Sequence, residues 1–317
     1  MTLRVPGIMW HTSLAMAPGG FVLAWFLGPG IIINVIVAKT ACVAMEAAAL
    51  AARRRPASQL RDGSAAMTGL IIGLCLPPLT PVLYIVVGSL FAIVIAKHLY
   101  GGLGQNLFNP AMVGYAAMVV AWPLALSIWP ASDEQPTLTD LAAIKFHLVA
   151  ADGFSGATPL DQFRYREGLT TEEFWALGGV NITPWLWSNV AFLAGGAWLL
   201  YRRIISWAAP VSMLLTLIVL SVLLYDSGSS HSLGSPYLHL FTGATMMAAF
   251  FIVTDPVSSP DARIGQYLFG AGVGLLTFVI RAGGGYPEGV AFAVLLMNAA
   301  SPLIDHLYYR GRHAIST

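Results

Sequence analysis

The chain is organised around one short stretch, Asp152-Gly153-Phe154-Ser155-Gly156-Ala157-Thr158-Pro159-Leu160. This stretch lies within residues 131–187, the one long polar segment of an otherwise apolar sequence. The polar segment separates two hydrophobic regions of similar length, residues 1–130 and 188–317. We therefore expect three parts: two membrane-embedded regions, and between them a polar loop that carries the stretch.

The composition excludes a water-soluble globular protein. Of the 317 residues, 57% are hydrophobic and 10% are charged, and the mean hydropathy is +0.72, whereas soluble domains carry about 25% charged residues. A net charge of +1 gives no electrostatic basis for binding nucleic acid. Cys42 and Cys75 lie in apolar runs without metal-ligand spacing, so no metal site is expected. These features predict a protein that crosses the membrane several times.

Ten segments are apolar enough to be membrane-spanning helices, which need about 20 mostly apolar residues. They lie at about 8–27, 30–52, 64–78, 80–99, 107–129, 188–201, 207–225, 237–254, 264–281 and 287–308. Proline and glycine interrupt several of them, as at residues 76–81 and 255–260. The predicted fold class is therefore all-α, with about ten transmembrane helices, some of them broken.

Basic residues in the short loops predict the orientation, because cytoplasmic loops carry an excess of Lys and Arg. With the N-terminus in the cytoplasm, the basic residues on the inner side are Arg4, Arg53, Arg54, Arg55, Arg61, Lys97, Arg202, Arg203, Arg263, Arg310 and Arg312. Those outside are Lys145, Arg164, Arg166 and Arg281. The bias predicts that both termini are cytoplasmic and that residues 131–187 are extracytoplasmic.

The two hydrophobic regions also resemble each other. Thr68-Gly69 opens an apolar run that ends in the prolines of residues 78–81, and Thr242-Gly243 opens one that ends in those of residues 256–260. Because each region holds five predicted spans, an odd number, the second would be inserted upside down. Inverted repeats with broken helices place binding sites near the repeat interface, where helix ends expose backbone N–H and C=O groups.

The stretch itself has the chemistry of a modification site. Gly156 and Ala157 add almost no side-chain bulk, so the active site of another protein can close on this backbone. Thr158 supplies a hydroxyl that can become a phosphoester, and Pro159 disfavours helix at Thr158. Asp152 can be recognised by a modifying enzyme.

A second copy of the tetrapeptide shows how little the pattern means alone. Thr242-Gly243-Ala244-Thr245 also fits [ST]-G-A-T, but it lies within a predicted span and has His239 where the acid would stand. We interpret this copy as small residues at a helix-packing surface. The location of the first copy therefore carries the hypothesis.

Three further blocks, in chain order with this motif, carry a family resemblance. They read RDGSA at residues 61–65, AKHLYGGLGQNLFNPAM at 96–112 and AFFIVTDP at 249–256. With these residues the chain resembles the NqrB/RnfD family. That family comprises membrane subunits of the Rnf electron-transport complex and of the sodium-pumping NADH:quinone oxidoreductase.

The resemblance implies a covalent flavin. In this family a flavin transferase links FMN through its phosphate to the threonine of [ST]-G-A-T. By motif match this residue is Thr158, with Asp152, Ser155, Gly156 and Ala157 as recognition elements. Some members of the family also bind riboflavin non-covalently among the spans.

The resemblance also implies a translocase complex in the bacterial inner membrane. Such a complex passes electrons between ferredoxin and NAD and couples this to Na⁺ or H⁺ movement. The implied partners are RnfA, RnfB, RnfC, RnfE and RnfG. Of these, RnfG carries its own covalent FMN, and RnfA and RnfE hold an iron–sulfur centre.

Several other residues suit a function or a structural role equally well. Lys39 and Glu46 lie seven apart in one predicted span, and ionisable groups there often mark an ion pathway. Asp255 follows a broken helix, where it would contact an ion or flavin, or cap backbone N–H groups. Asn106 and Asn109 would contact a flavin or cap a helix. We interpret Lys97 and His98, at a span end, as interfacial anchors.

Two alternative functions remain. One is an inverted-repeat transporter or channel without a redox role, in which residues 131–187 are a linker. The other is the NqrB-type subunit, which differs mainly in its partners and in reducing quinone.

Overall fold

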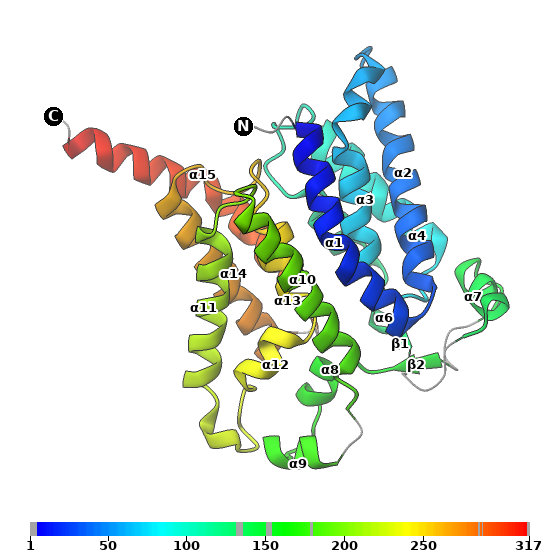
Figure 1. The fold of residues 1–317 in the computed structure, drawn as a ribbon, viewed down its shortest axis with the longest axis vertical. Helices are drawn as coiled ribbons and strands as arrows, with labels where there is room; N and C mark the ends of the chain where they lie inside the picture. The colour runs from blue at the N-terminus through cyan, green and yellow to red at the C-terminus, as the bar shows by residue number, and fades with distance from the viewer. Residues whose placement is uncertain are drawn as a thin grey trace. The chain divides into compact units, whose positions relative to one another are not determined.

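The computed structural model describes residues 5–130, 136–149, 154–177, 180–284, 286 and 288–315 (Figure 1). The chain divides into two compact units, Met1–Ala157 and Thr158–Thr317, which are treated separately below. The polar segment 131–187 is thus shared between the two units, and the three-part division expected from sequence stays a prediction. Almost all of the described chain is helical, which agrees with the predicted all-α class.

The first unit is a bundle of apolar helices (blue to green in Figure 1). Its elements are α1 (Val5–Leu27), α2 (Gly30–Ala52), η1 (Ala57–Asp62), α3 (Ser64–Cys75), α4 (Val82–Leu90), the π-helix η2 (Phe91–His98), α5 (Pro110–Ala121), α6 (Pro123–Ser127), β1 (Trp129–Pro130), α7 (Leu138–Lys145) and β2 (Ser155–Gly156). Strands β1 and β2 pair antiparallel, with Trp129 opposite Gly156.

The second unit begins with two short helices and continues with long apolar ones (green to red in Figure 1). Its elements are α8 (Pro159–Arg164), α9 (Thr171–Ala176), α10 (Thr183–Tyr201), α11 (Ala208–Leu223), η4 (Asp226–Gly228), α12 (Pro236–Phe241), α13 (Thr245–Met247), the π-helix η5 (Ala248–Ile252), α14 (Arg263–Gly283) and α15 (Val290–Ile315).

Glycines spaced four apart hold one close helix pair in each unit. In the first unit, a Cβ at Gly69 would lie 2.5 Å from Lys39 Cα, and a Cβ at Gly73 would lie 2.5 Å from Val35 Cα, so α3 packs directly on the α2 backbone. In the second unit, Gly270 and Gly274 bring α14 equally close to α11. Such small residues let helices approach when hydrophobic burial does not drive their association in lipid.

Each of the ten predicted apolar segments contains helix, and the predicted interruptions at residues 76–81 and 255–260 are non-helical or turn. In the described part of the chain, three helices are long and apolar enough to span a membrane: Gly30–Ala52, Arg263–Gly283 and Val290–Arg310. Four shorter apolar helices accompany them, at Ser64–Cys75, Val82–His98, Pro110–Ala121 and Ala208–Leu223. This is the pattern of a polytopic membrane protein.

The polar segment is folded and is anchored to each unit by its own small core. In the first unit, Leu141 and Ile144 of α7 are buried against Leu79. In the second unit, Leu160 and Phe163 of α8 and Phe174 of α9 form a cluster with Leu238 of α12. The segment that carries Thr158 is therefore a packed structure rather than a simple linker loop.

Candidate functional site

Thr158 begins helix α8 as its N-cap residue. Its backbone is extended (φ −66°, ψ 157°), as Pro159 at the first helical position favours. The Thr158 hydroxyl donates to Asp161 Oδ2 at 2.7 Å, and Thr158 Oγ1 accepts from the Asp161 N–H at 3.2 Å. The side chain is half-buried, so the hydroxyl is held in one place without being enclosed.

Asp161 has an unusual electrostatic setting for a residue of the polar segment. Burial raises the pKa of its carboxyl, while the hydrogen bonds from Thr158 and the charge of Arg164 lower it and Glu288 raises it. Arg164 itself donates to the backbone oxygen of Tyr286 at 3.3 Å, which ties α8 to the connection between α14 and α15. Asp161 is thus a carboxyl that retains its proton to higher pH than usual.

The residues before Thr158 leave its hydroxyl approachable. Gly156 lies in β2 opposite Trp129, and Ala157 is exposed. Asp152 lies outside the described residues, as does the side chain of Ser155, so their predicted part in recognition stays a prediction. A half-exposed threonine beside glycine and alanine fits a phosphoester-linked group.

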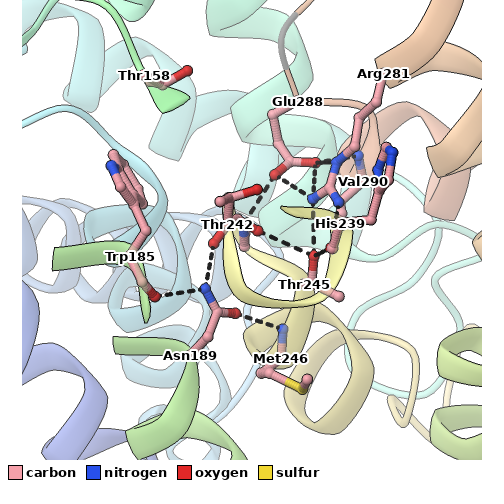
Figure 2. A network of polar contacts seen from close by, with 12 residues as sticks. Thr158, Trp185, Asn189, His239, Thr242, Thr245, Met246, Arg281, Glu288 and Val290 are labelled. Carbon is pink, nitrogen blue, oxygen red and sulfur yellow. Dashed lines mark hydrogen bonds and ion pairs between the residues drawn. The ribbon is translucent and has the colours of Figure 1, made fainter. Parts of the chain in front are cut away.

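The second [ST]-G-A-T copy lies at a break in a helix (Figure 2). Helix α12 ends at Phe241, Thr242 is extended, and Gly243 has a φ of +57°, which favours glycine. The interpretation as a helix-packing surface is therefore wrong, because the chain is not helical across residues 242–244. Thr245 restarts the helix and is fully buried.

Backbone groups freed by this break are bonded by side chains from three other elements (Figure 2). Asn189 of α10 donates to Gly243 O at 3.0 Å and accepts from the Met246 N–H at 2.9 Å. Arg281 of α14 donates to His239 O at 2.8 Å, and Glu288 accepts from the Ala244 N–H at 2.9 Å. The break is thereby stabilised, since unpaired backbone groups are costly in an apolar environment.

An ion pair fixes two of these side chains. Arg281 Nη2 lies 2.8 Å from Glu288 Oε2, and the same nitrogen donates to Thr245 Oγ1 at 3.0 Å. The Thr245 hydroxyl donates to His239 O at 2.7 Å. Thr158 is drawn in the same view, but no dashed line joins it to the network (Figure 2). Sequence reasoning missed Asn189, Arg281 and Glu288, because they come from separate elements.

The first unit contains a buried ion pair at Glu46. Lys97 is 1% exposed and donates to both carboxylate oxygens of Glu46, at 2.7 and 2.6 Å. The third Lys97 donor goes to Ser64 Oγ at 2.7 Å. The sequence blocks at 61–65 and 96–112 thus meet at this ion pair, although 33 positions separate Ser64 from Lys97.

The prediction that Lys97 and His98 are interfacial anchors is wrong. Both are buried, and His98 Nε2 lies 3.7 Å from Glu46 Oε1. The missed signal was Glu46, because a buried carboxylate requires a cation nearby. Lys39 is half-buried, and its backbone packs against Gly69.

Asn106 and Asn109 are both buried and lie at the start of α5. Asn109 is the N-cap residue and accepts from the Met112 N–H at 3.2 Å, which is the capping role considered from sequence. Asn106 donates to Phe108 O at 3.1 Å. Within the described residues, Asn106 Oδ1 is a buried acceptor without a hydrogen bond.

Asp255 holds the turn after η5. Its side chain accepts from the Val257 N–H at 3.1 Å and from the Ser258 hydroxyl at 2.9 Å. Asn298 of α15 donates to Ser258 O at 3.0 Å. The described part of the chain contains no group of three or more His, Cys, Asp or Glu placed to hold a metal ion.

Lys145 is a second buried lysine, which sequence reasoning placed in an outer loop. Its ammonium donates to Asn34 Oδ1 at 2.6 Å and to Thr80 O at 3.0 Å. Asn34 also donates to Pro77 O at 2.8 Å, so the two side chains satisfy carbonyls of the 76–81 interruption. Burial lowers the pKa of Lys145 to about 7.

Comparison with known proteins gives a consistent match over the whole chain. A family model described as the NQR2, RnfD, RnfE family matches residues 2–313. The RnfD protein of the ion-translocating oxidoreductase complex of Cellvibrio japonicus is 47% identical, over 96% of this chain and 89% of the relative. The protein of the same name from Pseudomonas paraeruginosa is 48% identical, over 98% and 92%, and that from Citrobacter koseri is 43% identical, over 96% and 93%.

Proposed function

Since this chain belongs to the NQR2, RnfD, RnfE family, we propose that it is the RnfD component of an ion-translocating oxidoreductase complex, with FMN linked covalently to Thr158. The relatives carry the RnfD name at 43–48% identity over nearly their full length. In the proposed complex, electrons pass between ferredoxin and NAD, and their flow is coupled to Na⁺ or H⁺ movement.

One observation carries the attachment site: the hydroxyl of Thr158 is half-exposed and fixed at the start of α8, whereas that of Thr245 is buried. A transferase must bring a phosphorus atom to the oxygen that it modifies. Thr158 Oγ1 meets this requirement, because the exposed Ala157 precedes it and the packed α8 holds it in place.

FMN supplies one- and two-electron chemistry when it is bound. The residues of this chain anchor and orient it. Leu160 and Phe163 fix α8 on the second unit, and Arg166 donates to Ser232 O at 2.6 Å and to Ser230 O at 2.8 Å. This packing gives the attachment point a defined position, as electron transfer between fixed centres requires.

We further propose ten membrane crossings, arranged as two inverted repeats of five helices. The support is that all ten apolar segments contain helix, five in each unit, and that the basic residues favour cytoplasmic termini and an extracytoplasmic, periplasm-facing segment 131–187. A cysteine in place of Glu167 should react with an impermeant thiol reagent on intact cells. Protection there would reverse the orientation.

Glu46, Lys39 and Asp255 remain the proposed ion-pathway residues. Glu46 is the best supported, because a carboxylate paired with Lys97 inside an apolar bundle is costly to keep. For Lys39, normal ion pumping by an assembled Lys39→Met complex would remove it from the pathway.

Riboflavin is proposed as a second, non-covalent flavin near Asn106 and Asn109. The buried and unbonded Asn106 Oδ1 suits an N–H donor of a flavin ring. Denaturation should release riboflavin from the complex, and release from Asn106→Ala in the wild-type amount would contradict the site.

The proposed partners are RnfA, RnfB, RnfC, RnfE and RnfG, together with a flavin transferase for maturation and the lipid bilayer. The chain should co-purify with the other five subunits in detergent, and isolation alone under mild conditions would contradict this. The transporter alternative has no support from the family match. The NqrB-type alternative is disfavoured by the RnfD name of the relatives.

In-gel flavin fluorescence tests the attachment site. The chain co-expressed with a flavin transferase should give a fluorescent band after denaturing electrophoresis, and Thr158→Ala should abolish it. Thr245→Ala is the matched control, because it removes the same hydroxyl from the other copy, and it should keep the band. Fluorescence that persists in Thr158→Ala would overturn the assignment.

A further inference from the structure

Three short helices of the polar segment begin with the same pair of residue types. Thr137 and Asp140 begin α7, Thr158 and Asp161 begin α8, and Thr170 and Glu173 begin α9. In each pair the hydroxyl donates to the carboxylate, at 2.6, 2.7 and 2.9 Å respectively. In each pair the threonine oxygen also accepts from the backbone N–H of the acid at 3.2 Å. Helix capping explains this shared geometry.

Only the surroundings of the α8 pair differ among these three. Thr137 and Glu173 are exposed, whereas Thr158 and Asp161 are half-buried. Hydrogen bonds from Thr170 lower the pKa of Glu173, as capping predicts. Burial instead raises the pKa of Asp161, despite equivalent hydrogen bonds from Thr158. The α8 carboxylate is therefore a stronger base than a capping acid needs to be.

We propose that Asp161 is the base that takes the proton from Thr158 Oγ1 when the flavin phosphate is attached. The inference rests on the proposed covalent FMN at Thr158. The geometry supports it directly: Oγ1 and Oδ2 are 2.7 Å apart, within the 2.6–3.2 Å that a general base requires, and the hydroxyl donates to the carboxylate.

The reaction balances with a flavin dinucleotide as the activated donor. Thr158 Oγ1 attacks the flavin-side phosphorus of the pyrophosphate, and a new O–P bond forms as the bridging P–O bond breaks. The mononucleotide half leaves as a phosphate monoester, and the hydroxyl proton passes to Asp161 Oδ2. No oxidation or reduction occurs in this step.

The raised basicity of Asp161 also suits the product. An ionised carboxylate would repel the negative phosphodiester that replaces the hydroxyl. A protonated carboxyl can instead donate to a phosphodiester oxygen, so that the transferred proton removes the repulsion. The other charged groups that act on Asp161 are Arg164 on its own helix and Glu288 at the connection between α14 and α15.

The test is the rate of flavin incorporation into the full chain in detergent, measured with a flavin transferase and flavin adenine dinucleotide from pH 5 to pH 8.5. Asp161→Asn keeps the size of the side chain and an acceptor oxygen, and it should lower the maximal rate about 100-fold without changing the KM for the dinucleotide. The ratio of the wild-type rate to the variant rate should rise with pH as Asp161 ionises. Titration of the transferase itself cancels in this ratio.

Glu173→Gln and Asp140→Asn are the matched controls, because each removes the acid of an equivalent cap. Both should be flavinylated at the wild-type rate. Asp161→Glu should recover part of the rate and the rise with pH, and it carries the test if Asp161→Asn does not fold. A wild-type rate in Asp161→Asn, or a pH-independent ratio of the wild-type rate to that of whichever variant folds, would overturn the proposal. Labelling of Thr158→Ala would instead overturn the attachment site itself.

Discussion

The two [ST]-G-A-T copies share a pattern and differ in almost every physical respect. Thr158 is half-buried at the start of a short helix, and its hydroxyl donates to one carboxylate. Thr245 is fully buried at a broken helix, where its hydroxyl donates to a backbone carbonyl and accepts from Arg281. The pattern therefore supplies a compact backbone with a hydroxyl, and the surroundings decide whether that hydroxyl is available for chemistry or used for stability.

The difference predicts opposite consequences for the two sites. At Thr158, substitution should remove the flavin and barely affect stability. At the broken helix, substitution should affect stability and leave the flavin attached in whatever protein folds.

The largest expected effect is at Arg281. Arg281→Met leaves the Glu288 carboxylate without its cation and His239 O without its donor, so it should destabilise the protein by about 3–5 kcal/mol. Denaturant unfolding in detergent measures this. The double variant Arg281→Met with Glu288→Gln should recover part of the loss, because it removes the unpaired charge. A loss below about 1 kcal/mol in the single variant, the range of an exposed ion pair, would mean that the break does not depend on this clamp.

Intermediate effects come from the two threonines. Thr245→Val keeps the shape and removes the hydroxyl, which should cost about 1–3 kcal/mol because buried partners lose a hydrogen bond. Thr158→Ala removes a helix cap and should cost about 1 kcal/mol. The comparison would fail if Thr158→Ala proved the more destabilising of the two in the same unfolding assay.

The smallest effect separates Asp161 from the other capping acids through pH. Because burial raises the pKa of Asp161, the stability linked to its proton is present at low pH and is lost as the pH rises through that pKa. Hydrogen bonds from Thr170 lower the pKa of Glu173 below its ordinary value of 4.5, so its contribution is present above that value and lost as the pH falls. From pH 4 to pH 7, the unfolding temperature of the wild type should therefore fall relative to Asp161→Asn and rise relative to Glu173→Gln. Shifts of the same sign would show that the two caps are equivalent.

The helices were predictable because spans in lipid need long apolar runs, and those runs are plain in the sequence. The interruptions at residues 76–81 and 255–260 were predictable from proline. The break at residues 242–244 was not, because it contains no proline, and it depends on Asn189, Arg281 and Glu288, which reach it from other elements. Local sequence carries no record of such partners.

For the candidate site, the sequence indicated Thr158 through its polar surroundings and the family motif. It did not indicate Asp161, because Thr-x-x-Asp is an ordinary helix start and only burial distinguishes this one. Lys97 shows the same limit: at a span end it resembled an interfacial anchor, and its pairing with Glu46 depends on packing between α2 and η2. Residue types were predictable, but their burial was not.

Mass spectrometry of the purified chain tests the central claim most directly. After proteolysis, the peptide that contains Thr158 should carry the mass of one FMN residue joined as a phosphoester, with fragment ions that place it on the threonine. The peptide that contains Thr245 should be unmodified. An unmodified Thr158 peptide from chain co-expressed with a flavin transferase, or FMN on Thr245, would contradict the account.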